Sequence, residues 1–186
     1  AAFFFFFMRA VLCAFLASFF LGWVSLDIGQ SKMKRELSHL MKSVHKSVLI
    51  WYSAAQMCEL VADVSKYPEF LPWCTYAKQL PPDADGSYVA EIGMGFAGMK
   101  QMFATRNVLV PAASLSMRLT EGPFSNLEGD WVFTPVEGDP GACRVTLDLH
   151  YAFNPLLSAI VGPVFDKIAN TMVDSFITRA EQVYGT

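Results

Sequence analysis

The sequence predicts an α+β fold, in which one long C-terminal helix lies against a curved antiparallel sheet of about seven strands. Two observations predict this arrangement. Residues 143–153, CRVTLDLHYAF, alternate strictly between apolar and polar side chains, as a half-buried strand does. Residues 155–184 instead carry apolar side chains at helical spacing, with charged and amide side chains on the opposite face. Because that apolar stripe is wide, we expect the concave face of the sheet to cover it.

Six further segments have strand-like patterns and are separated by turn-forming sequences such as PPDADG and EGDPGA. They are residues 43–50, 75–80, 87–95, 99–110, 114–119 and 127–133. Short strands joined by such turns indicate an antiparallel meander.

Two helices are expected beside the strands. Residues 54–64 have apolar side chains at helical spacing, and Ser53 is a suitable N-cap for them. In the long C-terminal helix, Gly162 and Pro163 should bend or restart the helix, because proline removes a backbone donor.

The first 40 of the 186 residues differ from the remainder in composition. Residues 1–26 are almost entirely apolar, include five consecutive Phe and are long enough to cross a bilayer. This segment fits an over-extended start, a membrane anchor followed by basic residues, or a signal peptide beginning at Met8. We expect an over-extended start or else a membrane anchor, and we treat residues 41–186 as the folded domain.

The charge and cysteine content of residues 41–186 limit the partners. This part contains ten Lys and Arg against fifteen Asp and Glu, so its net charge is −5 and DNA binding is not expected. Cys58, Cys74 and Cys143 are odd in number and widely spaced, which favours buried thiols in a reducing cytoplasm over disulfides.

No catalytic or metal-binding motif is evident. The stretch GMGFAG, residues 93–98, is followed by a strand-like segment, so it lacks the helix that a nucleotide-binding loop requires. His39, His45 and His150 are scattered, without accompanying carboxylates at metal-ligand spacing. We therefore expect a protein that is not an enzyme and carries no metal or cofactor.

One stretch, DVSKYPEFLPWC, places large apolar side chains between and beside Pro68 and Pro72. The two prolines preclude a long helix, which predicts a loop. Two interpretations remain open for it: the loop closes a ligand cavity, or it is a corner whose aromatic side chains pack into an ordinary core.

Three separated stretches resemble a known family. They are DVSKYPEFLPWC, EGPFSNLEGDWVFTP and GPVFDKIANTMVDSFITRAEQVYG. They are similar to the signature stretches of the coenzyme Q-binding START-like proteins, a branch of the polyketide cyclase/dehydrase superfamily that includes the ribosome association toxin RatA. The resemblance extends from Met41 to about Gly185. It implies a helix-grip fold, as in Bet v-like proteins, in which the sheet wraps the C-terminal helix and leaves an apolar cavity.

The resemblance and the apolar patterns together predict the residues that line this cavity. They are Tyr67, Phe70, Leu71, Trp73, Met94, Phe124, Trp131, Phe165, Ile168, Met172 and Phe176.

Two functions follow from the resemblance. The first is non-catalytic binding of ubiquinone or a polyprenyl quinone precursor, which supports respiration in the cytoplasm or at the periphery of the inner membrane. The alternative is a RatA-type toxin that binds the large ribosomal subunit and blocks subunit association. We place quinone binding first, because it gives the many apolar side chains a direct use. The net negative charge of the domain does not help it to bind a ribosome. A cyclase acting on an aromatic polyketide is a third and weaker interpretation, because no positioned acid or base can be named.

Overall fold

The computed structural model describes residues 41–96, 98–153 and 155–185, and it confirms the predicted α+β architecture. The predicted leader, residues 1–40, lies outside the described residues. Among the residues that are described, no helix is both long and apolar enough to span a membrane.

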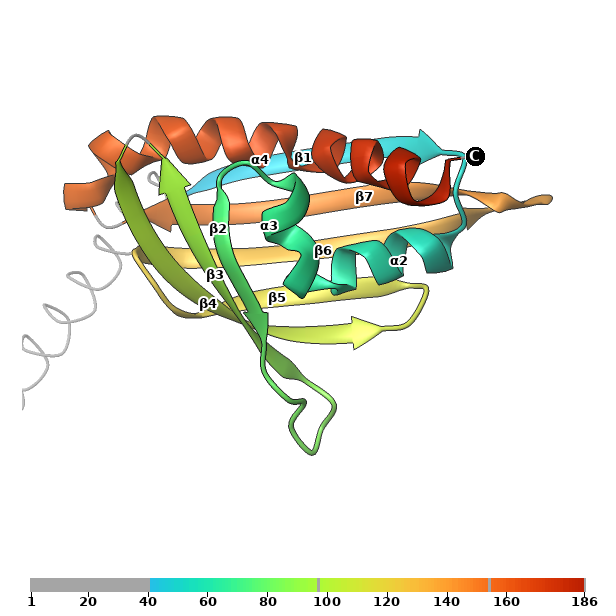
Figure 1. Cartoon of the computed structure of the whole chain (residues 1–186), viewed down its shortest axis with the longest axis horizontal. Helices are drawn as coiled ribbons and strands as arrows, with labels where there is room; N and C mark the ends of the chain where they lie inside the picture. The colour runs from blue at the N-terminus through green and yellow to red at the C-terminus, as the bar shows by residue number, and fades with distance from the viewer. Residues whose placement is uncertain (1–40, 97, 154, 186) are drawn as a thin grey trace, which may run out of the picture. The chain divides into compact units, whose positions relative to one another are not determined.

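Seven antiparallel strands form one curved sheet (Figure 1). They are β1 (Lys42–Ile50), β2 (Cys74–Gln79), β3 (Tyr88–Phe96), β4 (Met99–Val110), β5 (Ser114–Glu121), β6 (Phe124–Val136) and β7 (Asp139–Phe153). Their order in the sheet is β1-β7-β6-β5-β4-β3-β2, so a meander from β2 to β7 is closed by β1, which pairs with β7. The strands β2, β3 and β4 run at a steep angle to β1 and β7, which gives the sheet its curvature (Figure 1).

The alternation in β7 decides which side chains face the core. Cys143, Val145, Leu147, Leu149 and Tyr151 are buried, while the residues between them are more exposed. The strand is longer than predicted, because its pairing with β6 continues to Asp139 through a register shift near Pro135.

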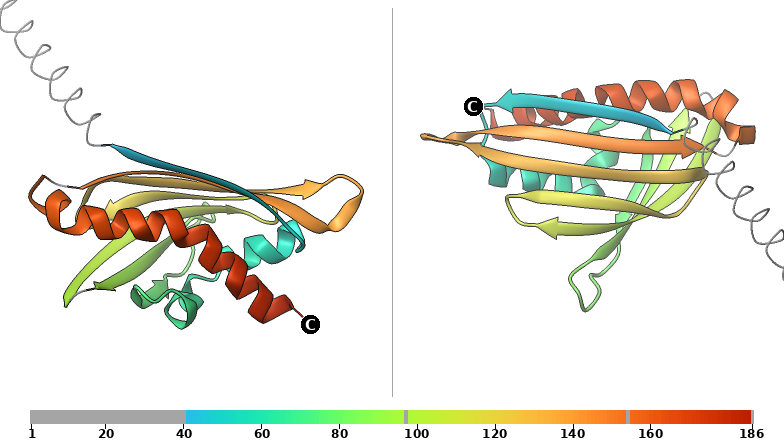
Figure 2. Two further views of the ribbon diagram at one scale, coloured as in Figure 1. Left: turned by 90° about the horizontal axis from the view of Figure 1, so that it is seen from above. Right: turned by 180° about the vertical axis from the view of Figure 1, so that it is seen from behind.

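The helices lie on one side of the sheet, its concave face (Figure 2). They are α2 (Ala54–Ala62), the short 3₁₀ segment η1 (Val64–Lys66), α3 (Tyr67–Phe70) and α4 (Pro155–Tyr184). The predicted N-cap of α2 is confirmed. The backbone N–H of Gln56 donates to Ser53 Oγ at 3.2 Å, and the backbone N–H of Ser53 donates to Gln56 Oε1 at 2.9 Å. This reciprocal pair satisfies two backbone donors and starts the helix at Ala54.

Two local predictions are corrected. Residues 64–70 form helical turns and not an irregular loop. Pro68 lies in the first turn of α3, where a backbone N–H would have no acceptor within the helix, so the proline costs no helical hydrogen bond. Of the predicted bend or restart at Gly162 and Pro163, the restart is wrong, because α4 continues from Pro155 to Tyr184 with Pro163 on its exposed side.

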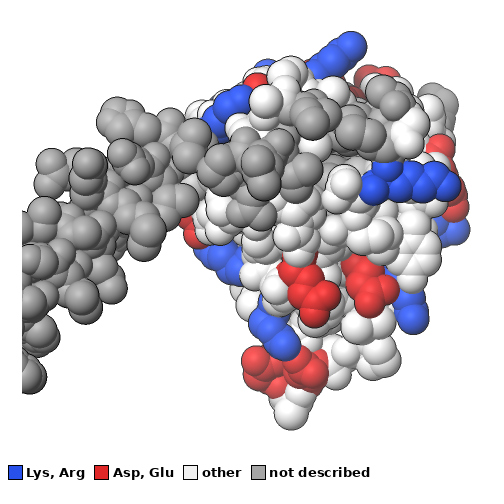
Figure 3. Space-filling view, turned by 90° about the vertical axis from the view of Figure 1, so that its left-hand side faces the viewer, with Lys and Arg blue, Asp and Glu red and all other residues white. Residues whose placement is uncertain are grey.

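Charged side chains of both signs are interspersed with uncharged ones on the face in Figure 3, and no broad basic surface is seen there. Several of the charged groups pair with each other. Arg118 makes two hydrogen bonds to the Asp130 carboxylate, both at 3.1 Å, on the outer face of the sheet.

Candidate functional site: an apolar cavity inside the sheet

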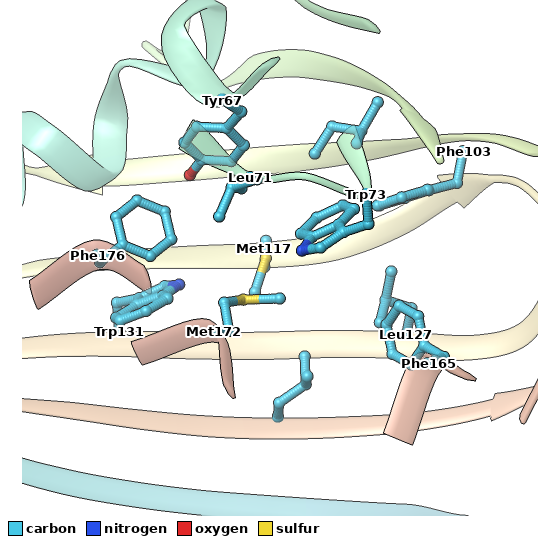
Figure 4. A pocket seen from close by; sticks show the side chains of 12 residues that line it. Tyr67, Leu71, Trp73, Phe103, Met117, Leu127, Trp131, Phe165, Met172 and Phe176 are labelled. Atoms are coloured by element: carbon cyan, nitrogen blue, oxygen red, sulfur yellow. The ribbon is translucent and has the colours of Figure 1, made fainter. Parts of the chain in front are cut away.

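A small cavity lies between the concave face of the sheet, the α3 region and α4 (Figure 4). Its volume is about 50 Å³, and its walls are almost entirely apolar. The lining residues are Tyr67, Leu71, Trp73, Ile92, Phe103, Met117, Leu127, Trp131, Leu149, Phe165, Met172 and Phe176.

The cavity is too small for a ring-headed lipid as it stands. Sites for ligands of that size occupy roughly 300–1,000 Å³, whereas about 50 Å³ has room for only a few water molecules. A bulky ligand would enter only if some lining side chains moved. Met117 and Met172, whose side chains point into the middle of the group in Figure 4, are flexible and unbranched and are therefore suited to such repacking.

The α3 region supplies three lining residues with different environments. Tyr67 and Leu71 are core side chains, exposed by only 8% and 1%. The Tyr67 hydroxyl donates to the carbonyl oxygen of Val61 at 2.7 Å, near the C-terminus of α2. Burial raises the pKa of Tyr67 well above its usual value, and nearby Tyr88 adds to the effect, so the phenol stays neutral.

Trp73 and Phe70 are only partly buried, but just one of them lines the cavity. Trp73 follows α3 and reaches inward. Phe70 packs on Phe176 with ring centroids 5.2 Å apart, and the Arg179 guanidinium carbon lies over the Phe70 ring, 5.4 Å from its centroid. Phe70 instead lines a separate surface groove beside the C-terminal part of α4. The sequence DVSKYPEFLPWC therefore contributes both to the core and to the cavity wall.

On α4, three of the four predicted residues line the cavity: Phe165, Met172 and Phe176. Ile168 is buried without lining it. Trp131 of β6 also lines the cavity, and its ring centroid lies 5.2 Å from that of Phe176.

Two predicted strand residues also pack elsewhere. Phe124 stacks on Phe153 with ring centroids 4.5 Å apart, and its centroid lies 5.0 Å from that of Phe165 in α4. Met94 is fully buried and pairs with Cys74 across β2 and β3.

Five lining residues were not predicted. They are Ile92, Phe103, Met117, Leu127 and Leu149. The alternating patterns of β3, β5, β6 and β7 place four of them on the same face as the predicted residues, so the signal was present. It could not separate cavity walls from ordinary core.

Among the described residues, no group of three His, Cys, Asp or Glu side chains is placed to bind a metal ion. His45 and His150 lie on the outer face, where they bond Asp148 and Ser43 respectively, as their alternation predicts. Gly98 has a φ of +79° between β3 and β4, so this glycine serves a hairpin turn. The three cysteines of the domain are buried free thiols.

Comparison with known proteins shows what this chain resembles. Residues 50–177 match the model of the family described as polyketide cyclase/dehydrase and lipid transport. The chain is 46% identical over 143 residues to the ribosome association toxin RatA of Pseudomonas aeruginosa, which covers 76% of this chain and 97% of that protein. It is 30% identical over 143 residues to the mitochondrial coenzyme Q-binding protein COQ10 homolog B of Xenopus laevis, covering 75% of this chain and 58% of that protein.

A solved structure shows the same fold. The crystal structure of the Zhui aromatase/cyclase from Streptomyces sp. R1128 superposes with a TM-score of 0.62 at 20% identity, over 76% of this chain and 94% of that one. At this identity the likeness concerns the fold alone, and it confirms the helix-grip arrangement.

Proposed function

We propose that this chain is a cytoplasmic ribosome association protein of the RatA kind. The chain belongs to the polyketide cyclase/dehydrase and lipid transport family, whose model it matches over residues 50–177. The single observation that carries the proposal is the 46% identity to a protein with that name, over 97% of its length. Identity to the coenzyme Q-binding relative is lower, at 30%. Sequence reasoning alone places quinone binding first; the relatives favour the opposite order.

The size of the cavity supports the same order. A volume of about 50 Å³ gives no room for a quinone ring without repacking, whereas binding to a ribosomal subunit uses the outer surface and needs no cavity. We therefore propose that the chain binds the large ribosomal subunit and hinders its joining to the small one.

Overproduction of the full chain in a bacterial host tests this proposal. We expect the fraction of joined ribosomes in a sucrose gradient to fall and the free subunits to rise. Met172→Trp is the informative variant, because the larger side chain should fill the cavity at a cost of about 1–3 kcal/mol. Since Met172 lies inside the molecule, the folded variant should still shift the gradient. An unchanged gradient on overproduction of folded parent protein would contradict the ribosomal role.

Quinone binding is kept as a second candidate function, because the interior offers an apolar cavity walled by aromatic rings and two methionines. A prenylated quinone would suit such walls. Organic extraction of the purified full chain should then release a quinone from the parent protein but not from Met172→Trp. The two functions do not exclude each other, since one uses the surface and the other the interior.

A further inference from the structure

Three buried polar side chains lie on the concave face of β3 and β4, in an interior that is mostly apolar. Tyr88, Thr105 and Asn107 are exposed by 4%, 1% and 3%. Tyr88 and Asn107 are directly opposite each other in the β3–β4 ladder, and Thr105 shares their face two residues earlier in β4. The Thr105 hydroxyl donates to Asn107 Oδ1 at 2.9 Å.

The Tyr88 hydroxyl is buried and makes no well-formed hydrogen bond among the described residues, although the Asn107 side chain lies close enough to lower its pKa. Buried polar atoms are normally paired, because they lose their hydrogen bonds to water on folding. Burial raises the pKa of Tyr88, although the nearby Asn107 opposes the shift, so the hydroxyl stays protonated and able to donate. An unpaired donor in this position needs an acceptor that the described chain does not supply.

The orientation of Asn107 points to the same kind of acceptor. Because Oδ1 of Asn107 already accepts from Thr105, the Nδ2 group is the part of the amide that remains to donate. Two donors from adjacent strands therefore lie side by side here, close enough for the Asn107 side chain to lower the pKa of Tyr88. Such a pair suits a carbonyl or ether oxygen better than a hydroxyl that must itself donate.

Met117 is a neighbour of these groups in the sheet and also lines the cavity. In the sheet, Met117 pairs with Asn107 on one side and with Gly129 on the other. Its side chain lies across Gly129, where the methyl carbon takes the place that a side chain would occupy, and it also lines the cavity. Because methionine is flexible, a change of its rotamers would join the apolar cavity to the polar groups.

We propose that Tyr88 and Asn107 form the polar end of a binding site for a small amphiphile with an oxygen acceptor on its head group, and that Met117 divides this end from the cavity until the ligand enters. The inference deepens the quinone-binding candidate and does not depend on the ribosomal role. The apolar part of the ligand would occupy the enlarged cavity between Trp73 and Met172, and its oxygen would accept from Tyr88.

Equilibrium dialysis of the full chain with two probes tests the site. The first probe is ubiquinone with a single isoprenoid unit, and the second is prenylbenzene, which has no oxygen. For Tyr88→Phe and for Asn107→Leu we expect the Kd of the quinone to rise about five-fold, the effect of one hydrogen bond. The Kd of prenylbenzene should not change. Tyr88→Phe should also melt at the same temperature as the parent protein or higher, because it removes an unpaired buried hydroxyl.

Four results would overturn the site. They are a parent protein that binds the quinone without saturation, variants that bind it as tightly as the parent, an equal loss of both probes, and a Tyr88→Phe protein that melts earlier. Tyr88→Phe keeps the shape of the ring, so it decides the question even where Asn107→Leu does not fold. The sucrose gradient is a separate measurement. If the parent protein lowers the fraction of joined ribosomes but binds no quinone, the ribosomal function stands and the proposed site is contradicted.

Discussion

At the scale of single residues, the buried tyrosines Tyr67 and Tyr88 make a matched pair. The Tyr67 hydroxyl donates to the Val61 carbonyl at 2.7 Å, whereas the Tyr88 hydroxyl has no partner among the described residues. Tyr67→Phe should lower the free energy of unfolding by about 1–3 kcal/mol, because it leaves a carbonyl at the end of α2 unpaired. Urea unfolding of both Phe variants measures the difference, with Tyr88→Phe as the control. Equal stability of the Tyr67→Phe variant and the parent would contradict a role for this bond.

The same residue should affect stability at alkaline pH. The folded-state pKa of Tyr67 is raised. The residue therefore contributes fully to the free energy of unfolding at pH values below its unfolded-state pKa of about 10. Above that pH the unfolded chain releases the proton and the folded chain keeps it, so the free energy of unfolding falls as pH rises. The loss from one such group is at most about 1.4 kcal/mol per pH unit. Unfolding at pH 8 and pH 11 should show a smaller loss for Tyr67→Phe than for the parent.

At the scale of elements, α4 contains a glycine that has room for a side chain toward neighbouring elements. A Cβ at Gly162 would have its nearest neighbours, Lys42 Nζ and Ser158 Oγ, at 3.9 Å, which is ordinary contact. Gly162→Ala should therefore raise the free energy of unfolding by less than about 1 kcal/mol, because alanine loses less backbone entropy in a helix but its Cβ is crowded by the ring of Pro163.

Gly129 in β6 is the matched control for this substitution. Its Cβ would meet the Met117 side chain and approach Leu149 Cδ1 to 3.1 Å, so Gly129→Ala should destabilise the protein by about 1–3 kcal/mol. Urea midpoints of the two variants should move in opposite directions. A Gly162→Ala protein that unfolds earlier than the parent would mean that α4 needs a local distortion next to Pro163.

At the scale of the whole molecule, the balance of charge predicts how a ribosome would be bound. Residues 41–186 carry a net charge of −5, and both signs are interspersed on the face in Figure 3. A protein that makes six to ten phosphate contacts loses about 10³–10⁵ in affinity between 50 and 200 mM salt. We expect the affinity of the chain for the large subunit to fall less than about ten-fold over that range of salt, because the chain would contact ribosomal protein more than RNA backbone. Co-sedimentation with purified large subunits at increasing salt measures this slope, and a steep loss would indicate extensive RNA contact.

The patterns along the chain were sufficient for the strands, for α2 and α4 and for the family. Strand-like patterns between turn-forming sequences predicted all seven strands, helical spacing predicted α2 and α4, and Ser53 was correctly placed as an N-cap. These properties depend on neighbours within a few positions, which the sequence displays directly.

The tertiary structure alone decided what the interior can hold. Of the eleven predicted lining residues, Phe70, Met94, Phe124 and Ile168 lie away from the cavity, although all four are apolar. The free volume depends on how side chains from five strands and two helical segments interdigitate, and no local pattern encodes that sum. The same is true of Tyr88 and Asn107: alternation can place them on the inner face, but the missing hydrogen-bond partner becomes evident only when β3 and β4 pair in their observed register.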